Sequence, residues 1–252
     1  MRTIFRNLSS LLTVGLLAAA LAAQTNSAAR YDGSVQNKVS QELAKKKEFR
    51  NVQASVEDGI VTLNGTVELY QQKLDAAKKV HKTKQVQGVR NLIEVAGKNV
   101  PDDQLDAQLD KKLYYDRIGY DNEFNYVTAS VKDGTVTLTG ETRLPMDRDS
   151  ALALVNTTPG VKDVINDVTV APVSFFDDRI RLGALRAIYH DPVLSRYAID
   201  PARPIRIVVE NGHLTLCGTV MNSMDKQIAG IRAGNVFGAF SVQNDLQVAK
   251  KS

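Results

Sequence analysis

Residues 56–65 read VEDGIVTLNG, in which an Asp-Gly pair separates two stretches of alternating apolar and polar residues. The run recurs as VKDGTVTLTG at residues 131–140 and as VENGHLTLCG at residues 209–218. A second run, VRNLIEV at residues 89–95, recurs at residues 164–170 and 242–248 with the same offsets, 75 and 78 residues. Two runs in constant register over three copies indicate three tandem small domains, because solenoid repeats are usually shorter.

Each copy of the first run predicts a β-hairpin. Its central Asp-Gly or Asn-Gly pair suits a type I′ turn, in which both central residues take positive φ. The predicted turn glycines are Gly59, Gly134 and Gly212. A second glycine follows six residues later in each copy, and we expect it to end the second strand where the chain bends toward a helix: Gly65, Gly140 and Gly218.

Helical periodicity flanks each hairpin. Before the hairpins, the predicted apolar faces are Val35, Val39 and Leu43, then Leu105, Leu109 and Leu113, then Ile180, Leu185 and Ile188. After the hairpins, they are Leu74, Ala77 and Val80, then Ala151, Leu154 and Val155, then Met224, Ile228 and Ile231. Ser34 is the predicted cap of the first helix. The Asp102-Asp103 and Asp177-Asp178 pairs are expected to cap the other two helices and complement their dipoles, in preference to binding calcium.

The resulting order is αββαβ, and a strand–helix–strand crossover is right-handed with parallel strands. The predicted fold class is therefore α+β, with three tandem αββαβ two-layer sandwiches. Each is a three-stranded mixed sheet covered on one face by two helices. The predicted domains span residues 34–98, 102–172 and 177–250.

The N-terminus predicts export. Arg2 and Arg6 precede an uncharged, leucine-rich stretch, and small residues follow up to Ala23. This order is typical of a cleavable signal peptide, here residues 1–23. The stretch is short for a membrane-spanning helix, which is the alternative interpretation. We therefore expect a periplasmic protein that can associate with a membrane surface.

Composition argues against several kinds of chemistry. One cysteine, Cys217, excludes an internal disulfide framework and a cysteine-based metal site. Cys217 is expected on a half-exposed strand face, too far from His213 for a nucleophile–base pair. No spacing of the three histidines indicates a metal, and no phosphate-binding glycine loop occurs. We expect no catalytic residues, no metal and no cofactor. The net charge of +4 does not point to nucleic acid.

Charge is uneven along the chain. Residues 34–100 hold 12 Lys and Arg against 7 Asp and Glu, whereas residues 101–172 hold 7 against 13. Three interpretations are open: a solvated face, an attraction between the first two domains, or a site for anionic lipid head groups. The residues proposed for that site are Lys45, Lys46, Lys47, Lys78, Lys79 and Lys82. Tyr114-Tyr115 and Phe175-Phe176 are candidates for interface or membrane contact, although internal packing is the favoured role.

The pattern V-x-D-G-x-V-T-L-x-G, followed by a helix and a G-V-x-x-V-x-N-x-[VLI]-x-V strand, resembles the BON domain in three copies, of which the third matches least well. The resemblance implies a secreted, non-enzymatic envelope protein. It also implies a link to osmotic stress or outer-membrane maintenance, and binding to anionic phospholipid or to a partner at the membrane surface. The alternative is a peptidoglycan-binding, glycan-binding or protein–protein adaptor module in the periplasm. The ligand and the oligomeric state are not predicted.

Overall fold

A computed structural model describes residues 29–117 and 121–249 of the 252-residue chain. The predicted signal peptide, residues 1–23, lies outside the described residues. Contacts divide the chain into two units at Lys98 and Asn99. The first unit holds one sheet-and-helix repeat and the second holds two.

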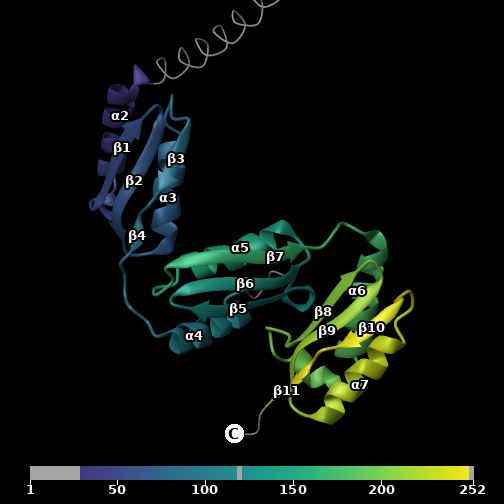
Figure 1. The fold of residues 1–252 in the computed structure, drawn as a ribbon. Coiled ribbons are helices and arrows are strands. Elements are labelled where there is room, and N and C mark those ends of the chain that lie inside the picture. The colour runs from purple at the N-terminus through teal and green to yellow at the C-terminus, as the bar shows by residue number, and fades with distance from the viewer. Residues whose placement is uncertain (1–28, 118–120, 250–252) are drawn as a thin grey trace, which may run out of the picture. The chain divides into compact units, whose positions relative to one another are not determined.

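In the first repeat, helix α2 (Asp32–Ala44) and the 3-10 turn η1 (Lys47–Phe49) precede the hairpin of β1 (Val52–Glu57) and β2 (Ile60–Val67). Helix α3 (Tyr70–His81) and the short strands β3 (Gly88–Asn91) and β4 (Glu94–Val95) follow. Strand β2 is central, antiparallel to β1 and parallel to β3 and β4. The two helices contact one another and lie on the same face of the sheet (Figure 1).

The second repeat has the same order. Helix α4 (Asp102–Tyr115) and η2 (Asn122–Phe124) precede β5 (Tyr126–Lys132) and β6 (Thr135–Thr142), and α5 (Pro145–Asn156) leads to β7 (Asp163–Val170). The third repeat comprises α6 (Phe175–Tyr189), η3 (Leu194–Ala198), β8 (Ile205–Glu210), β9 (His213–Val220), α7 (Ser223–Gly234), β10 (Ser241–Asn244) and β11 (Gln247–Val248). In each, the central strand is antiparallel to the strand before it and parallel to those after it.

The predicted α+β fold of three repeated sandwiches is confirmed. One detail differs, because the last strand is continuous only in the second repeat and is split in two in the other repeats. At the split, the amide of Asn91 donates to the Lys73 carbonyl (2.8 Å), and Asn244 bonds the Lys226 carbonyl in the same way (2.7 Å). In the first and third repeats, the asparagine of the second sequence run thus ties the last strand to the second helix.

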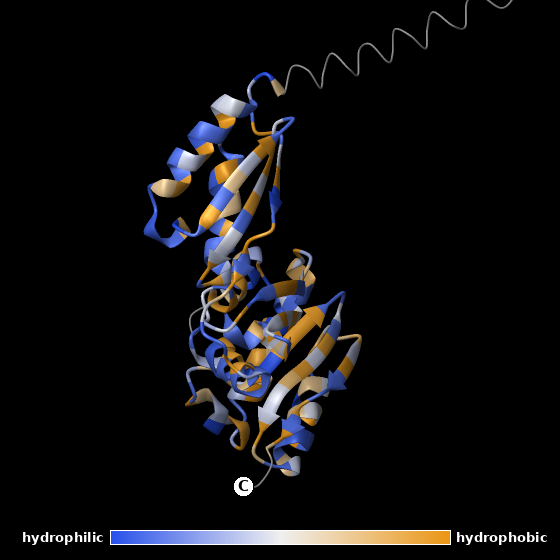
Figure 2. Ribbon diagram, turned by 60° about the vertical axis from the view of Figure 1, so that its left-hand side comes forward, coloured by the Kyte–Doolittle hydropathy of each residue, from blue (hydrophilic) through white to orange (hydrophobic). Residues whose placement is uncertain are grey.

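The cores follow the first helices as predicted. Val35, Val39 and Leu43 are buried, as are Leu105, Leu109 and Leu113. The prediction for the second helices is partly wrong, since Leu74, Met224 and Ile231 are exposed. Alanines occupy the buried positions instead, namely Ala76 in α3 and Ala229 and Ala233 in α7. Small side chains let a helix lie close to its sheet and turn the larger apolar residues outward. Hydrophobic and hydrophilic bands alternate along the helices and strands (Figure 2).

The turn glycines Gly59, Gly134 and Gly212 follow residues that also have positive φ, as a type I′ turn requires. The prediction for the second set of glycines is wrong. Gly65, Gly140 and Gly218 lie inside strands that continue for two more residues. A Cβ atom at Gly140 would lie 1.9 Å from the carbonyl oxygen of Tyr126, so the close approach of the neighbouring chain excludes any side chain there.

The second and third repeats share an interface. Phe124 of η2 belongs to the hydrophobic core of the third repeat. Tyr114 donates a hydrogen bond to Asp200 (3.0 Å), and the guanidinium group of Arg206 lies over the Tyr114 ring at 5.4 Å. Tyr114, a candidate for interface contact or internal packing, lies in this interface between repeats.

Candidate functional site

An aspartate in the first turn of the first helix holds the hairpin turn of every repeat. Asp102 accepts hydrogen bonds from the backbone N–H groups of Asp133 (2.6 Å) and Gly134 (2.9 Å). Asp32 binds the turn at Gly59 in the same way (2.9 Å), and Asp177 binds the turn at Gly212 (2.8 Å). The two amides of each turn point out of the hairpin, and the carboxylate satisfies both.

The predicted capping roles are wrong, but both aspartate pairs lie in the first turn of their helices, where they complement the helix dipole as expected. The N-cap residues are Tyr31, Pro101 and Ser174, and Ser34 lies inside α2. Asp32 and Asp102 are the first residues of their helices and Asp177 is the third residue of α6, and from these positions each carboxylate reaches the hairpin turn of its repeat. Asp102 and Asp177 thus belong to the framework of the repeats, and a calcium role is not needed to explain them.

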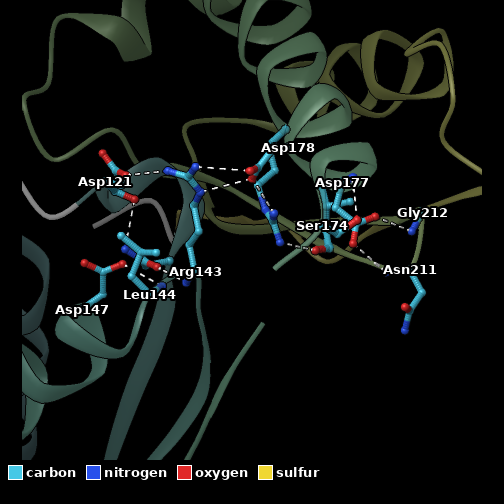
Figure 3. Close-up of polar contacts among 12 residues, drawn as sticks. Asp121, Arg143, Leu144, Asp147, Ser174, Asp177, Asp178, Asn211 and Gly212 are labelled. Carbon is cyan, nitrogen blue, oxygen red and sulfur yellow. Dashed lines mark hydrogen bonds and ion pairs between the residues drawn. The ribbon is translucent and has the colours of Figure 1, made fainter. Parts of the chain in front are cut away.

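Asp178 has a different role, at the joint between the second and third repeats (Figure 3). Arg143 bridges Asp121 (3.0 Å) and Asp178 (3.2 Å), and Arg181 also contacts Asp178 (2.9 Å). Burial alone would raise the pKa of Asp178, but the hydrogen bonds from the two arginines outweigh it and lower that pKa. The network is a structural link, because both arginines are held by carboxylates.

Three of the six lysines in the predicted lipid site form ion pairs with glutamates. Lys45 and Lys79 both pair with Glu42, and Lys46 lies 3.7 Å from Glu48. Hydrogen bonds from Lys45 and then Lys79 lower the pKa of Glu42 to about 2. Three predicted lysines, Lys47, Lys78 and Lys82, have no ion pair among the described residues and are exposed. The six lysines thus do not act as one uniform patch.

A surface that the sequence analysis did not identify lies on the helical side of the third repeat. Because α6 and α7 contact one another and cover the same face of the sheet, their outward sides form one layer (Figure 1). Phe175 is 87% exposed and Phe237, just after α7, is 95% exposed. A groove of about 300 Å³ runs between α6 and the end of α7 and is lined by Arg179 and Phe237. A second hollow, of about 380 Å³, joins Arg179 to Phe175 and Leu182.

The fully exposed charges on this layer are positive, although Arg232 pairs with Asp191 (2.6 Å) and the partly exposed Asp178 lines the hollow beside Phe175. The exposed residues of α6 are Phe175, Arg179, Leu182 and Arg186, and those of α7 are Ser223, Met224, Gln227, Ile231, Arg232 and Gly234. None of them is acidic. We call this surface the α6–α7 face, defined by these residues and Phe237. Only the Phe175-Phe176 pair gave a sequence signal for it, and the structure exposes Phe175 while Phe176 packs against the core.

The side chains of Cys217 and His213 do not form a reactive pair. Cys217 is buried, which corrects the half-exposed position predicted for it, and burial raises the pKa of its thiol to about 11. His213 contacts Ser241 instead, with 2.7 Å between Nδ1 and Oγ. Within residues 29–117 and 121–249, no three His, Cys, Asp or Glu side chains group as a metal site would need. In those same ranges, no helix has the length and apolarity to cross a bilayer.

Each of the three repeats matches one known domain family. The model of the BON domain matches residues 31–97, 101–172 and 193–250. The chain belongs to the BON domain family. The third BON match begins after α6, although α6 carries the hairpin-binding Asp177 in the position that α2 and α4 occupy in the other BON repeats. A 3-10 turn follows the first helix in every repeat, but the segment between α6 and β8, residues 190–204, is longer than its counterparts at residues 45–51 and 116–125.

No curated protein matches the chain. Among solved structures, it is similar to the C-terminal domain of CdsD, the structural protein of the type III secretion system of Chlamydia trachomatis. The identity is 13% over 84% of this chain and 96% of that one, with a TM-score of 0.26. It is also similar to the periplasmic domain of the type III secretion inner membrane protein PrgH from S. typhimurium. There the identity is 12% over 83% and 100% of the two chains, with a TM-score of 0.19.

Proposed function

We propose that this BON protein is a non-enzymatic periplasmic protein that docks on anionic phospholipid through the α6–α7 face. The single observation that carries the proposal is the composition of that face, where exposed Phe and Leu side chains alternate with arginines and no exposed carboxylate occurs. An apolar helical face bordered by cations is the pattern of helices that lie in a membrane interface. Membership of the BON family and the predicted signal peptide support the location and a role in envelope maintenance or osmotic stress.

The geometry of α6 fits this mode of binding. Phe175, Arg179, Leu182 and Arg186 follow one another at intervals of three or four residues, so they lie along one side of the helix. Aromatic rings and leucines can enter the region between head groups and acyl chains, while the arginines meet lipid phosphates. Each cation near an anionic surface contributes about 1 kcal/mol, and salt weakens this contribution.

Co-sedimentation with vesicles tests the proposal. Wild-type protein is expected to bind vesicles that contain phosphatidylglycerol, to bind neutral phosphatidylcholine vesicles weakly, and to dissociate as salt rises. The F175S/F237S variant is expected to lose binding. Ile199→Ser is the matched control, because Ile199 is also exposed (84%) but lies outside the α6–α7 face.

Equal binding of both vesicle types, or unchanged binding of the F175S/F237S variant, would show that the proposal is wrong. The peptidoglycan adaptor that the sequence leaves open predicts a different pattern. It predicts retention on isolated cell wall and no response of vesicle binding to the two phenylalanine changes.

A further inference from the structure

A groove in the first repeat lies between α2 and the edge strand β1 and has a volume of about 860 Å³. Its lining residues come from the end of α2, from η1 and from β1, and all belong to this repeat: Gln36, Ser40, Leu43, Ala44, Lys46, Lys47, Phe49, Arg50, Val52, Gln53 and Ala54. Apolar residues form part of the floor, and basic side chains stand at one end. The groove shares no residue with the α6–α7 face, so binding of a ligand in the groove does not require that face to bind lipid.

The second repeat has the same groove in the same place. Leu113 of α4 corresponds to Leu43, since each lies eleven residues after the aspartate that binds the hairpin turn. Val127 corresponds to Val52, because each pairs with the glycine inside the next strand. Leu113 and Val127 also line a cavity, which is smaller than the first groove, at about 280 Å³. The two grooves are therefore equivalent by position in the fold.

In the second repeat the third repeat occupies this groove. The cavity there is also lined by Pro204 and Arg206, at the beginning of β8. Arg206 lies over the ring of Tyr114, and Asp110 lines the same cavity on the α4 side. Strand β8 is an edge strand of its own sheet. The third repeat thus closes this groove with the beginning of an edge strand, together with Gly218 and Thr219 of β9 and Gln247 of β11.

In the first repeat the edge of the sheet is open. No strand pairs with the outer side of β1 in the part of the chain that the structure describes. The side chain of Gln36 donates to the Ala54 carbonyl (2.6 Å), so a side chain of α2, and not a further strand, satisfies this main-chain acceptor of β1. Ala44 stands where the second repeat has Tyr114, which leaves more room above the floor. Exposed edge strands are templates for the addition of an extended segment.

The groove of the first repeat is basic. Lys46, Lys47 and Arg50 line it and its lining contains no carboxylate, whereas the cavity of the second repeat is mixed in charge, with Asp110, Arg117 and Arg206 in its lining. Lys46 is near Glu48, so Lys47 and Arg50 carry the charge that is available to a partner. We propose that the groove between α2 and β1 binds an extended acidic segment of another protein, alongside the edge strand.

The chain supplies its own probe for this proposal. Residues 203–210, RPIRIVVE, include the part of the third repeat that occupies the second groove. A fluorescent peptide of this sequence and a second one with Arg203→Glu and Arg206→Glu are titrated against the full chain, and binding is measured by anisotropy. The acidic peptide is expected to bind about tenfold more tightly than the native one, because two exposed charge pairs change sign.

Variants locate the site. Binding of the acidic peptide is expected to fall about tenfold in a K47E/R50E variant, which should then prefer the native basic peptide. The matched control is K78E/K82E, which makes the same change of charge on α3 outside the groove. Circular dichroism confirms that both variants are folded.

Three results would overturn the proposal. In the first, both peptides bind alike, or K78E/K82E weakens the acidic peptide as much as K47E/R50E does. In the second, K47E/R50E abolishes binding to phosphatidylglycerol vesicles and leaves peptide binding unchanged, which would make the groove a lipid site. In the third, the full chain self-associates and K47E/R50E abolishes this, which would make a second copy the occupant. Tight binding of the acidic peptide with the expected exchange of preference supports the proposal, whatever the outcome of the vesicle assay on the α6–α7 face.

Discussion

We predict that two neighbouring aspartates of α4 contribute unequally to stability, because only one of them binds the hairpin turn. Asp102 and Asp103 both lie in the first turn of α4, and both complement the helix dipole. Only Asp102 accepts the two turn hydrogen bonds, at 2.6 and 2.9 Å. A helix-terminal carboxylate contributes about 0.3–1 kcal/mol through the dipole. Two hydrogen bonds to a half-buried carboxylate add about 2 kcal/mol, at roughly 1 kcal/mol each.

Asp102→Ala is therefore expected to destabilise the unit of residues 99–252 by about 2–3 kcal/mol, and Asp103→Ala by less than about 1 kcal/mol. Urea unfolding followed by circular dichroism measures the difference. Hydrogen exchange of the Asp133 and Gly134 amides gives a local measure, and their protection should fall about 30-fold in Asp102→Ala alone, which is the equivalent of about 2 kcal/mol. Equal losses of stability in the two variants, or unchanged protection of the turn amides, would refute the reasoning and restore the capping interpretation.

Three further predictions concern packing and ionisation. Gly140→Ala is expected to lower the free energy of unfolding by more than about 3 kcal/mol, because its Cβ would lie 1.9 Å from a carbonyl oxygen. A Cβ at Gly33 meets no atom within 4 Å, so Gly33→Ala should be neutral or stabilising. Thermal denaturation compares the two variants. Cys217 should react with a thiol reagent at pH 8 only after unfolding, since burial raises its pKa to about 11; rapid labelling of the native protein would contradict this. The folded-state pKa of Glu42, about 2, lies below its ordinary value of 4.5, so its contribution to stability is complete above pH 4.5 and is lost as pH falls toward 2. Glu42→Gln should flatten the pH dependence of stability in that window, and an unchanged slope would argue against the pairing with lysine.

Much of the fold could be predicted from local sequence patterns. Asp58-Gly59 and its two counterparts define hairpins through backbone conformation, which depends on few neighbours. Val35, Val39 and Leu43 define a buried face because helical spacing brings them together. The role of Gly65 could not be read in this way. Its cause is the carbonyl oxygen of Asn51, which lies just before the neighbouring strand β1.

The candidate surfaces were harder to predict, for two physical reasons. Apolar residues at helical spacing are predicted to be buried, so Met224 and Ile231 were expected in the core. The structure exposes both side chains, and only this orientation makes them available for contact. Contacts between repeats depend on residues that are distant in sequence, such as Arg143 and Asp178. Charge counts identified the basic first repeat correctly, but not that Glu42 holds two of its lysines.

A single introduced tryptophan tests most directly whether the α6–α7 face enters the membrane interface. The chain contains no tryptophan, so Phe237→Trp and, as the control, Ile199→Trp each carry one fluorophore at an exposed position. With phosphatidylglycerol vesicles, we expect the emission of the Phe237→Trp variant to shift to the blue and to be quenched by brominated acyl chains, while the Ile199→Trp variant changes little. Identical behaviour of the two variants, or no change in either at saturating lipid, would contradict the proposed docking.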